Sequence, residues 1–491
     1  MKSSTELPDI LIIVLDSLRA DTIHSLAASN RAENIWRDGK MWNFFPNAIA
    51  PAPWTIPSHS SLFTGRYPFE HHTHWRGSVE LSPDFTTLAE HVRSVGYATA
   101  SFSENELVSP SFGLTRGFER AYWKSDNQLT ALGIGHEAST GSAEARNSHV
   151  ESTGRGLAKS LLPLAEVGER VPLMIECLCR LQRFRKTLTH TSQEPSSNWV
   201  EHRFVRWLHS QPASKPLFGF VNLMNCHEPY FMQPESINDV LSWLKLYTVR
   251  QDKLGWLRGD WFPSERELEV LTSLYNSSAR TACHRASRFV SLLDQNRPRR
   301  NPLVFVTSDH GQAFGEGGHL YHGLSLEDAV VRIPLFVRGL DVAGGPQVTN
   351  SLTSLIDIFP TIEERVGTPG NKLALPGRAL DELVKAPRPD GVYCIGDGLS
   401  EFEVKRLHEK RLLALDRVGV AVYIGATKHA VFARRGIKNT FSFDTSLMET
   451  SPGLPRPVFS ELASLLSPLI QARSDCMSAR VRQRLERWGY F

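Results

Sequence analysis

The chain has 491 residues, of which 41% are hydrophobic and 22% are charged, and its formal net charge is +3. These values are ordinary for a soluble globular protein of two domains, or of one large α/β domain with an appendage. The small net charge argues neither for nor against nucleic acid or an anionic membrane, and no nucleic-acid partner is predicted. No stretch approaches the ~20 apolar residues of a membrane span. The six cysteines form no CxxC pair, which indicates reduced thiols and a cytoplasmic protein.

The N-terminal strand ends in a carboxylate. Ile10–Leu15 is a continuous apolar run, too short for a signal peptide and typical of a buried strand, and Asp16 follows it directly. A carboxylate at such a position is costly to bury without a partner. Two roles therefore stay open for Asp16, the cap of a helix that starts nearby or a metal ligand.

A proline-rich approach leads to a cluster of hydroxyl side chains. Residues 51–66 read PAPWTIPSHSSLFTGR, and we expect a helix over Ser58–Phe63 with Ser58 near its N-cap. A hydroxyl group at a helix N-terminus lies beside free N–H groups and the positive end of the helix dipole, which favours an anion. We predict Thr55 as a nucleophile here, with a purely structural role in a proline-rich turn as the alternative.

Three histidines follow, and a helix and a strand come after them. His71, His72 and His74 suit either metal or phosphate contacts or a surface loop, and we favour the surface loop. The spacing of apolar residues predicts an amphipathic helix over residues 83–95, and residues 97–102 return as a strand.

The segment 124–197 differs in composition from its surroundings. Its first part is rich in Gly, Ser, Ala and Thr, whereas residues 157–184 interleave leucines with basic residues and are predicted to be helical. We interpret the segment as an insertion or lid near the site. A surface for a membrane or a partner is the alternative for its apolar face.

Two further strands end in residues that suit a site. Residues 217–224 form an apolar run followed closely by His227, and Leu303–Thr307 is a buried strand followed by Asp309 and His310. An α/β sheet presents ligands at the carboxyl ends of its strands. A carboxylate beside a neutral imidazole suits a divalent cation such as Zn²⁺ or Mn²⁺. A polar turn after a core strand is the alternative.

The remaining elements are helices and a C-terminal sheet. We expect helices around residues 265–293, a strand over 330–337 and a proline-kinked helix over 352–362. From about residue 392 the predicted strands are short (411–415, 418–424 and 430–434), which suggests a small antiparallel sheet. Residues 479–489 read as a basic helix with a solvated face.

Taken together, these stretches resemble the sulfatase-like branch of the alkaline phosphatase superfamily. The matching segments are PDILIIVLDSLRAD, APWTIPSHSSLFTGRYP, NLMNCHEPY, VTSDHGQAFGEGGHLYHG and LTSLIDIFPTI. In this family the nucleophile lies in a C/S/T-x-P-S-R/H-x-x-L-x-T-G motif, which corresponds to Thr55–Gly65 here. The resemblance covers about residues 8–396, with a gap over 124–197.

The resemblance implies an α/β fold, with a large mixed, mostly parallel sheet flanked by helices and a small C-terminal antiparallel sheet. We therefore expect a catalytic domain over residues 1–395, interrupted by the segment 124–197, and a small α+β subdomain over residues 396–491.

The resemblance also implies a ligand set for one cation. Asp16, Thr55, Asp309 and His310 would surround a single divalent metal ion. Beside such an ion the hydroxyl pKa of Thr55 would fall, and the charge on the transferred group would be neutralised.

Three histidines complete the implied catalytic set. His227 and His322 would contact the non-bridging oxygens of the transferred tetrahedral group, and one of them would protonate the leaving group. His59 stands where the family usually has Arg, so less fixed positive charge lies beside the nucleophile.

Departures from the family pattern refine the expected chemistry. Thr55 cannot be converted into the formylglycine of many sulfatases, which favours phosphoryl or phosphonyl transfer over sulfate ester hydrolysis. Ser17 replaces a frequent Asp, and His310 replaces a frequent Asn, so Zn²⁺ or Mn²⁺ is favoured over Ca²⁺. Residues 225–227 lack the additional Asp of the two-zinc members, which favours one ion over two.

The expected function is a metal-dependent hydrolase of small-molecule phosphate or phosphonate esters that acts through a covalent Thr55 intermediate. The alternatives are a soluble transferase that passes a phospho-group to an acceptor alcohol, a sulfuric ester hydrolase, and a non-catalytic binding protein with a degenerate site. The substrate and the oligomeric state stay open.

Overall fold

The computed structural model describes most of the chain. The described residues are 7–28, 42–75, 77–125, 128–133, 195–230, 249–298, 301–342, 344–345, 347–367, 373–399, 407, 415, 417–435, 443–450, 452 and 455–471. The chain divides into two compact units, residues 1–132 with 199–491, and residues 133–198. Because most of the second unit lies outside the described residues, the site is built from the first.

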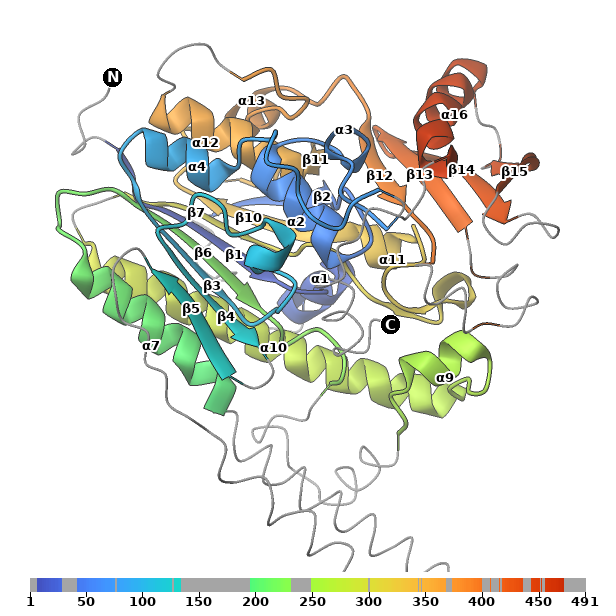
Figure 1. Ribbon diagram of the computed structural model, residues 1–491, viewed down its shortest axis with the longest axis horizontal. Helices are drawn as coiled ribbons and strands as arrows, with labels where there is room; N and C mark the ends of the chain where they lie inside the picture. Colours follow the sequence, from blue (N-terminus) through green and yellow to red (C-terminus); the bar gives the residue numbers. More distant parts are fainter. Residues whose placement is uncertain are drawn as a thin grey trace, which may run out of the picture. The chain divides into compact units, whose positions relative to one another are not determined.

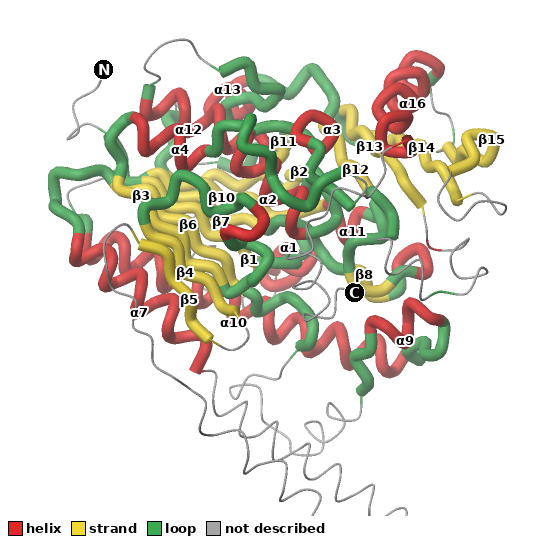
Figure 2. The backbone as a smooth tube through the Cα atoms, in the orientation of Figure 1, coloured by secondary structure: helices red, strands yellow, loops and turns green. Residues whose placement is uncertain are grey.

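The centre of the first unit is a mixed β-sheet (Figures 1 and 2). In the described part of the chain it has nine strands in the order β11-β2-β10-β7-β1-β6-β3-β4-β5. The pairs on either side of β1, β6 and β3 are parallel, whereas β10 runs antiparallel to both of its neighbours. The strands are β1 Ile10–Leu15, β2 Asn43–Ile49, β3 Ala98–Ser103, β4 Arg120–Ser125, β5 Gln128–Gly133, β6 Leu217–Leu223, β7 Leu303–Thr307, β10 Arg332–Arg338 and β11 Thr353–Ser354. The predicted fold class is therefore confirmed.

Helices cover both faces of this sheet, because its central strands are apolar on both sides. Along β1, Ile12 packs into one hydrophobic cluster and Ile13 into the other, as the alternation of side chains in a strand requires. Figure 1 shows α4 and α12 on one side of the sheet and α7 and α10 on the other. The first cluster includes α2 Thr55–Thr64, α4 Leu88–Ser94, α12 Ile358–Val366 and α13 Leu380–Lys385; the second includes α1 Ala20–Ala28, α7 Pro195–Ser210 and α10 Glu265–Asn296.

A second sheet forms near the C-terminal end. Its described strands are antiparallel and follow chain order, as β12 Val392–Gly396, β13 Arg417–Ile424, β14 Thr427–Arg435 and β15 Phe443–Thr450. Helix α16 Arg456–Gln471 packs Leu462 and Leu466 against one face of this sheet. The other face shares a core with Ile49 of β2, so the second sheet lies against the first.

Short elements complete the description. They are α3 Pro68–His71, α9 Lys253–Arg258, α11 Asp328–Val331, the two-stranded ribbon of β8 Ala313–Phe314 and β9 Leu320–Tyr321, and single 3₁₀ turns at Pro110–Phe112, Glu316–Gly318 and Leu355–Asp357. No described helix is long and apolar enough to cross a lipid bilayer.

Several predicted helix boundaries were wrong, and capping explains the differences. Helix α2 begins at Thr55 instead of Ser58, because Pro57 fits the first turn of a helix. Helix α4 begins at Leu88, since the Thr87 hydroxyl accepts a hydrogen bond from the Glu90 backbone and caps it. The helix expected over 352–362 is a short strand, a 3₁₀ turn and then α12, whose first turn holds Pro360 without a kink.

The histidine cluster was also predicted wrongly in part. His72 is exposed, but His71 and His74 are buried, with exposed fractions of 2% and 3%. The His71 ring bonds the Ser61 hydroxyl through Nε2 at 2.9 Å and accepts the Thr73 N–H at 3.1 Å. It therefore ties the loop to α2.

Some predictions fall outside the described residues. They are the helix over 157–184, all but the last residue of the strand over 411–415, and the basic helix over 479–489. The end of β4 and the whole of β5 lie inside the segment predicted as an insertion, whereas residues 126–127 and 134–194 are not described. The domain boundary at residue 395 stays a prediction.

Arg388 offers a test of how the fold is stabilised. Its guanidinium forms a buried ion pair with Asp357, and burial raises the pKa of that carboxyl group although Arg388 opposes the shift. Substitution of Arg388→Met would leave a buried carboxylate without its counter-charge, so the free energy of unfolding should fall by about 3–5 kcal/mol. Arg378→Met, which removes the exposed pair with Asp390, should cost less than about 1 kcal/mol. Denaturant unfolding of both variants tests this, and equal losses would contradict it.

Candidate metal and nucleophile site

The carboxyl ends of four adjacent parallel strands bring the site together. Strands β7, β1, β6 and β3 are neighbours, and Val14 is in register with both Thr307 and Asn222. The polar residues that follow these strands therefore lie at one edge of the sheet. They are Asp16 after β1, Asp309 and His310 after β7, His227 after β6 and Asn105 after β3.

Asp16, Asp309 and His310 form a compact group. Their ligand atoms lie within 4.8 Å of one another, and all three side chains are fully buried. His310 Nε2 lies 3.3 Å from Asp309 Oδ2 and 3.8 Å from Asp16 Oδ1. Asp16 and the adjacent pair Asp309 and His310, almost 300 positions away along the chain, thus face one point.

The two buried carboxylates of this group repel each other, and a positive charge between them would stabilise both. Burial, and then the neighbouring Asp16, raise the pKa of Asp309 well above its usual value. Burial lowers the pKa of His310 to about 4, which leaves the imidazole neutral and able to ligate. Asp309 Oδ2 and His310 Nε2 are buried without a hydrogen-bond partner among the described residues. Two carboxylates and an imidazole, with one ligand atom of Asp309 and one of His310 left unpaired in the described part of the chain, fit a divalent cation of the Zn²⁺ or Mn²⁺ type.

A strained turn holds Asp16 in this position. Ser17 has a φ of 64°, a left-handed conformation that costs energy for a residue other than glycine. Its N–H donates to Asp309 Oδ1 at 3.2 Å, and its carbonyl accepts the Tyr275 hydroxyl at 2.8 Å. The same hydroxyl accepts the Arg19 N–H at 2.8 Å, so α10 clamps both sides of the turn.

Thr55 lies at the N-terminus of α2, where its side chain is 1% exposed. The Asn105 side-chain amide lies 3.5 Å from Thr55 Oγ1 and donates to Asp16 Oδ2 at 2.7 Å. The Asn105 amide group therefore links the Thr55 hydroxyl group to the Asp16 carboxylate.

His59 lies behind Thr55 and is also fully buried. Its Nδ1 donates to the Thr55 carbonyl at 2.9 Å, because a carbonyl oxygen can only accept, and Nε2 faces the Asn222 amide at 3.0 Å. Burial lowers the pKa of His59 and keeps the ring neutral. Nδ1 is also 3.5 Å from Asp309 Oδ2. The described contacts of His59 thus fix the backbone of Thr55 and do not reach its hydroxyl group.

His227 and His322 form a second group with Glu228. Their ligand atoms also lie within 4.8 Å of one another, and the two imidazole rings meet at a centroid distance of 4.8 Å. The His322 ring is 4.4 Å from that of His310, which places the second group beside the first. Lys253 Nζ lies 3.5 Å from Glu228 Oε1. The structure therefore brings every predicted site residue to one edge of the sheet.

Sequence reasoning missed Asn105, Glu228 and Gln312. Asn105 follows β3 as Asp16 follows β1, so the rule applied to the other strands would have found it. Glu228 and Gln312 carried no comparable signal, because their importance lies in contacts with each other and with His322.

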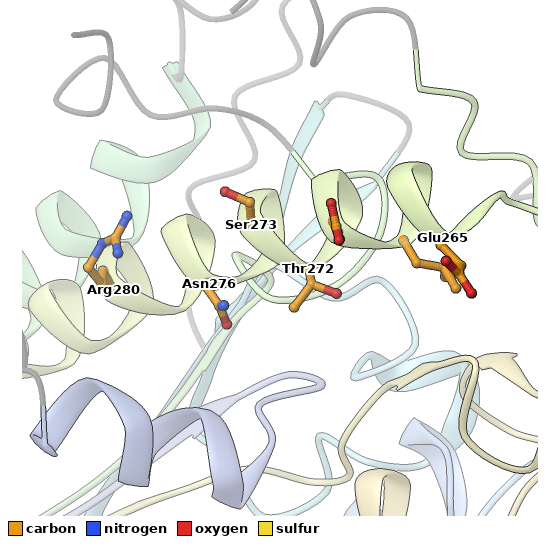
Figure 3. A pocket seen from close by; sticks show the side chains of 7 residues that line it. Glu265, Thr272, Ser273, Asn276 and Arg280 are labelled. Carbon is orange, nitrogen blue, oxygen red and sulfur yellow. The ribbon is translucent and has the colours of Figure 1, made fainter. Parts of the chain in front are cut away.

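A separate groove of about 730 Å³ runs along α10. Figure 3 shows Glu265, Thr272, Ser273, Asn276 and Arg280 along it. No predicted site residue is among the described residues that line it.

Comparison with known protein families and proteins gives a consistent result. A family profile described as Sulfatase matches residues 8–368. Arylsulfatase K of Canis lupus familiaris is 22% identical over 357 residues, which cover 66% of this chain and 56% of the relative. Iduronate 2-sulfatase of Mus musculus is 23% identical over 402 residues, with coverages of 75% and 70%. The chain thus spans little more than half the length of the first of these relatives.

Solved structures show the same fold at low sequence identity. A phosphonate monoester hydrolase of Agrobacterium radiobacter superposes with a TM-score of 0.56 at 18% identity, covering 94% of this chain and 96% of that one. A sulfatase-like structure from Bacteroides thetaiotaomicron VPI-5482 gives a TM-score of 0.58 at 14% identity, with coverages of 97% and 96%.

Metal titration tests the electrostatics of the group. Because the pKa of Asp309 is raised, the metal-free carboxylate pair holds a proton at pH values between the usual Asp pKa of about 4 and the raised value. Binding of Zn²⁺ or Mn²⁺ in this range should release about one proton per ion, and the affinity should rise with pH. Calorimetric titration in buffers of different ionisation enthalpy measures the release.

Two variants, one at the site and one on the surface, are compared for metal affinity and proton release. Asp309→Asn should abolish the proton release and weaken binding by more than the ~10–100-fold typical of an outer-sphere partner. Asp84→Asn, which changes an exposed carboxylate bonded to Ser82, should leave both unchanged. Tight binding with full proton release in Asp309→Asn would refute this assignment.

Proposed function

The chain belongs to the sulfatase family, and from this premise we propose that it is a metal-dependent hydrolase of phosphate or phosphonate esters that acts through a covalent Thr55 intermediate. One observation carries the proposal: the Thr55 hydroxyl, at the N-terminus of a buried helix, lies beside the group of Asp16, Asp309 and His310 and shares the Asn105 amide with Asp16.

The cation would be held by Asp16, Asp309 and His310, with Thr55 as the fourth residue. Bound there, it would supply positive charge that lowers the pKa of the nucleophile and neutralises charge on the transferring group. We propose one ion at this place, Zn²⁺ or Mn²⁺ in preference to Ca²⁺, because a nitrogen ligand replaces an oxygen.

The second group would bind the substrate instead of a second ion. Lys253 already lies beside Glu228, and each Nδ1 atom of the two histidines has a hydrogen-bond partner. The Nε2 atoms of His227 and His322 are therefore the ring atoms available for the oxygens of a tetrahedral group. His227 Nε2 is buried and has no partner among the described residues.

The reaction would proceed in two displacements at phosphorus. The Thr55 oxygen would form a bond to phosphorus as the bond to the leaving oxygen breaks, and a proton from His227 or His322 would neutralise that oxygen. The hydroxyl proton of Thr55 would be lost to solvent or to a histidine. Water would then attack phosphorus as the bond to Thr55 breaks, a proton from this water would return to the Thr55 oxygen, directly or through a histidine, and the free acid would leave. The N-terminus of α2 would stabilise negative charge throughout.

Residues behind the nucleophile would keep it in place. His59 bonds the Thr55 carbonyl, and the Ser58 hydroxyl donates to the Asp309 carbonyl at 2.6 Å. These bonds would hold the first turn of α2 against the loop after β7 and so position the hydroxyl group for attack. We therefore assign His59 to positioning within the catalytic set.

Sulfate ester hydrolysis is the second candidate, because the relatives at 22–23% identity are named as sulfatases. The phosphonate monoester hydrolase from Agrobacterium radiobacter shares only the fold at 18% identity. Chemistry favours phosphorus here: threonine has no aldehyde form, so a sulfated Thr55 lacks the hemiacetal route by which formylglycine expels sulfate.

Substitutions of Thr55 test the nucleophile. Thr55→Val removes the hydroxyl group at nearly constant volume, so turnover of the preferred ester should fall on the order of 10³-fold or more. Thr55→Ser keeps a hydroxyl group and should retain much of the activity. The measurement is steady-state hydrolysis of p-nitrophenyl phosphate, bis-p-nitrophenyl phosphate, p-nitrophenyl phenylphosphonate and p-nitrophenyl sulfate by the Zn²⁺- or Mn²⁺-loaded protein.

The panel also separates the candidates. If the protein hydrolyses only the sulfate ester, the reacting centre is sulfur and the proposed phosphorus chemistry is wrong. Full activity of Thr55→Val on any ester would rule out the covalent step. A folded, metal-loaded protein that hydrolyses none of the four esters would favour a binding protein.

A further inference from the structure

A buried glutamine connects the second group to the loop after β7. The Gln312 side-chain amide donates from Nε2 to Glu228 Oε2 at 2.9 Å and to the Tyr230 hydroxyl, and its Oε1 lies 2.8 Å from His322 Nδ1. Gln312 is fully buried. Each polar atom of its amide group therefore faces a specific partner.

Glu228 determines which way this amide points. Burial alone would raise the pKa of Glu228, but His227, Lys253 and the hydrogen bonds to the carboxylate lower it to about 2. An ionised carboxylate can only accept hydrogen bonds, whereas the Tyr230 hydroxyl can donate or accept. The amide nitrogen must therefore face Glu228, and Oε1 is left to face His322.

An amide oxygen, in turn, can only accept a hydrogen bond. His322 Nδ1 must therefore be the donor, which means that it carries the proton of the neutral ring. Among the described residues no hydrogen bond involves His322 Nε2, and the His322 ring lies 4.8 Å from that of His227 and 4.4 Å from that of His310. We infer that Gln312, oriented by Glu228, is a positioning residue that holds His322 as the Nδ1–H tautomer and directs Nε2 at the transferred group.

The backbone of Gln312 is fixed as firmly as its side chain. Its N–H donates to the Ala329 carbonyl at 3.0 Å, and its carbonyl accepts the Arg19 guanidinium at 3.0 Å. Glu228 is held from the other side by Lys253, at the start of α9. The chain from Lys253 through Glu228 and Gln312 to His322 therefore has little freedom to rearrange.

The consequence for chemistry rests on the proposed function. With Nδ1 protonated, Nε2 is the atom that would take up the proton lost by the Thr55 hydroxyl group and donate it to the leaving oxygen as the bond of that oxygen to phosphorus breaks. The imidazolium formed in between would be stabilised by the Gln312 carbonyl, with the Glu228 carboxylate 3.5 Å from Nδ1. Loss of Gln312 should therefore slow the hydrolysis of esters with poor leaving groups more than that of esters with good leaving groups.

The first test reads the tautomer directly and needs no turnover. The Zn²⁺-loaded protein is labelled with ¹⁵N-histidine, and long-range ¹H–¹⁵N spectra assign the proton to Nδ1 or Nε2 of His322. The spectrum of His322→Asn identifies its signals among the 18 histidines. The inference expects Nδ1–H in the unmodified protein, and Nε2–H there would overturn it whatever any variant does.

The second test uses Gln312→Met, which has a similar size but no amide group. In this variant the Nδ1–H signal should be lost or shared with Nε2. Turnover of phenyl phenylphosphonate should fall about 10–100-fold, with a smaller loss for the p-nitrophenyl ester. Gln251→Met is the matched control, since Gln251 holds the backbone of Tyr230 in the same loop at 2.7 and 3.1 Å. Gln251→Met should leave the tautomer of His322 unchanged, and also the ratio of the turnover rates of the two esters.

The two tests separate this inference from the proposed function. An unchanged tautomer and an unchanged ester ratio in folded Gln312→Met would overturn the role of Gln312. Nδ1–H in a protein that hydrolyses no ester would support the positioning role while the proposed function fails.

Discussion

The repulsion between two buried carboxylates is the constraint on which the rest of this site depends. Asp16 and Asp309 are fully buried within a few ångströms of each other, at the ends of adjacent parallel strands. In a medium of low polarity two such charges are stable together only with a cation or a proton between them. His310 is a neutral imidazole, so the compensating positive charge is either a proton shared by the two carboxylates or the cation that we propose.

The surrounding structure keeps this unfavourable arrangement from relaxing. Ser17 is held in a left-handed conformation by the Tyr275 hydroxyl group of α10, and its N–H binds one oxygen of Asp309. The Ser308 hydroxyl donates to the Leu15 carbonyl and accepts the Leu18 N–H, which ties the loops after β1 and β7 together. Strain at the site is thus maintained by a long helix and by the centre of the sheet, both of which are deeply packed.

Neutral side chains supply most of the remaining contacts. Asn105, His59 and Gln312 each hold a reactive or ligating residue through directed hydrogen bonds. Two cationic side chains of neighbouring helices are paired with carboxylates, Lys253 of α9 with Glu228 and Arg285 of α10 with Glu104. The candidate site thus has little unpaired positive charge of its own among the described residues, in keeping with the proposal that a bound cation supplies it.

The sequence by itself determined the central strands and the residues that follow them. Ile10–Leu15 and Leu303–Thr307 form strands with the predicted bounds, because a buried parallel strand is a local apolar run that ends where polar residues begin. For the same reason Asp16, Asp309, His310 and His227 could be predicted as neighbours at the sheet edge without a structure, and their ligand atoms do lie in two adjacent groups. Only the tertiary structure decided that His71 and His74 are buried, that His59 bonds the backbone of Thr55, and that Asn105, Glu228 and Gln312 contact the candidate site residues. These facts depend on which distant segments pack together, and a pattern along the chain does not record the partner that a side chain meets across the sheet edge.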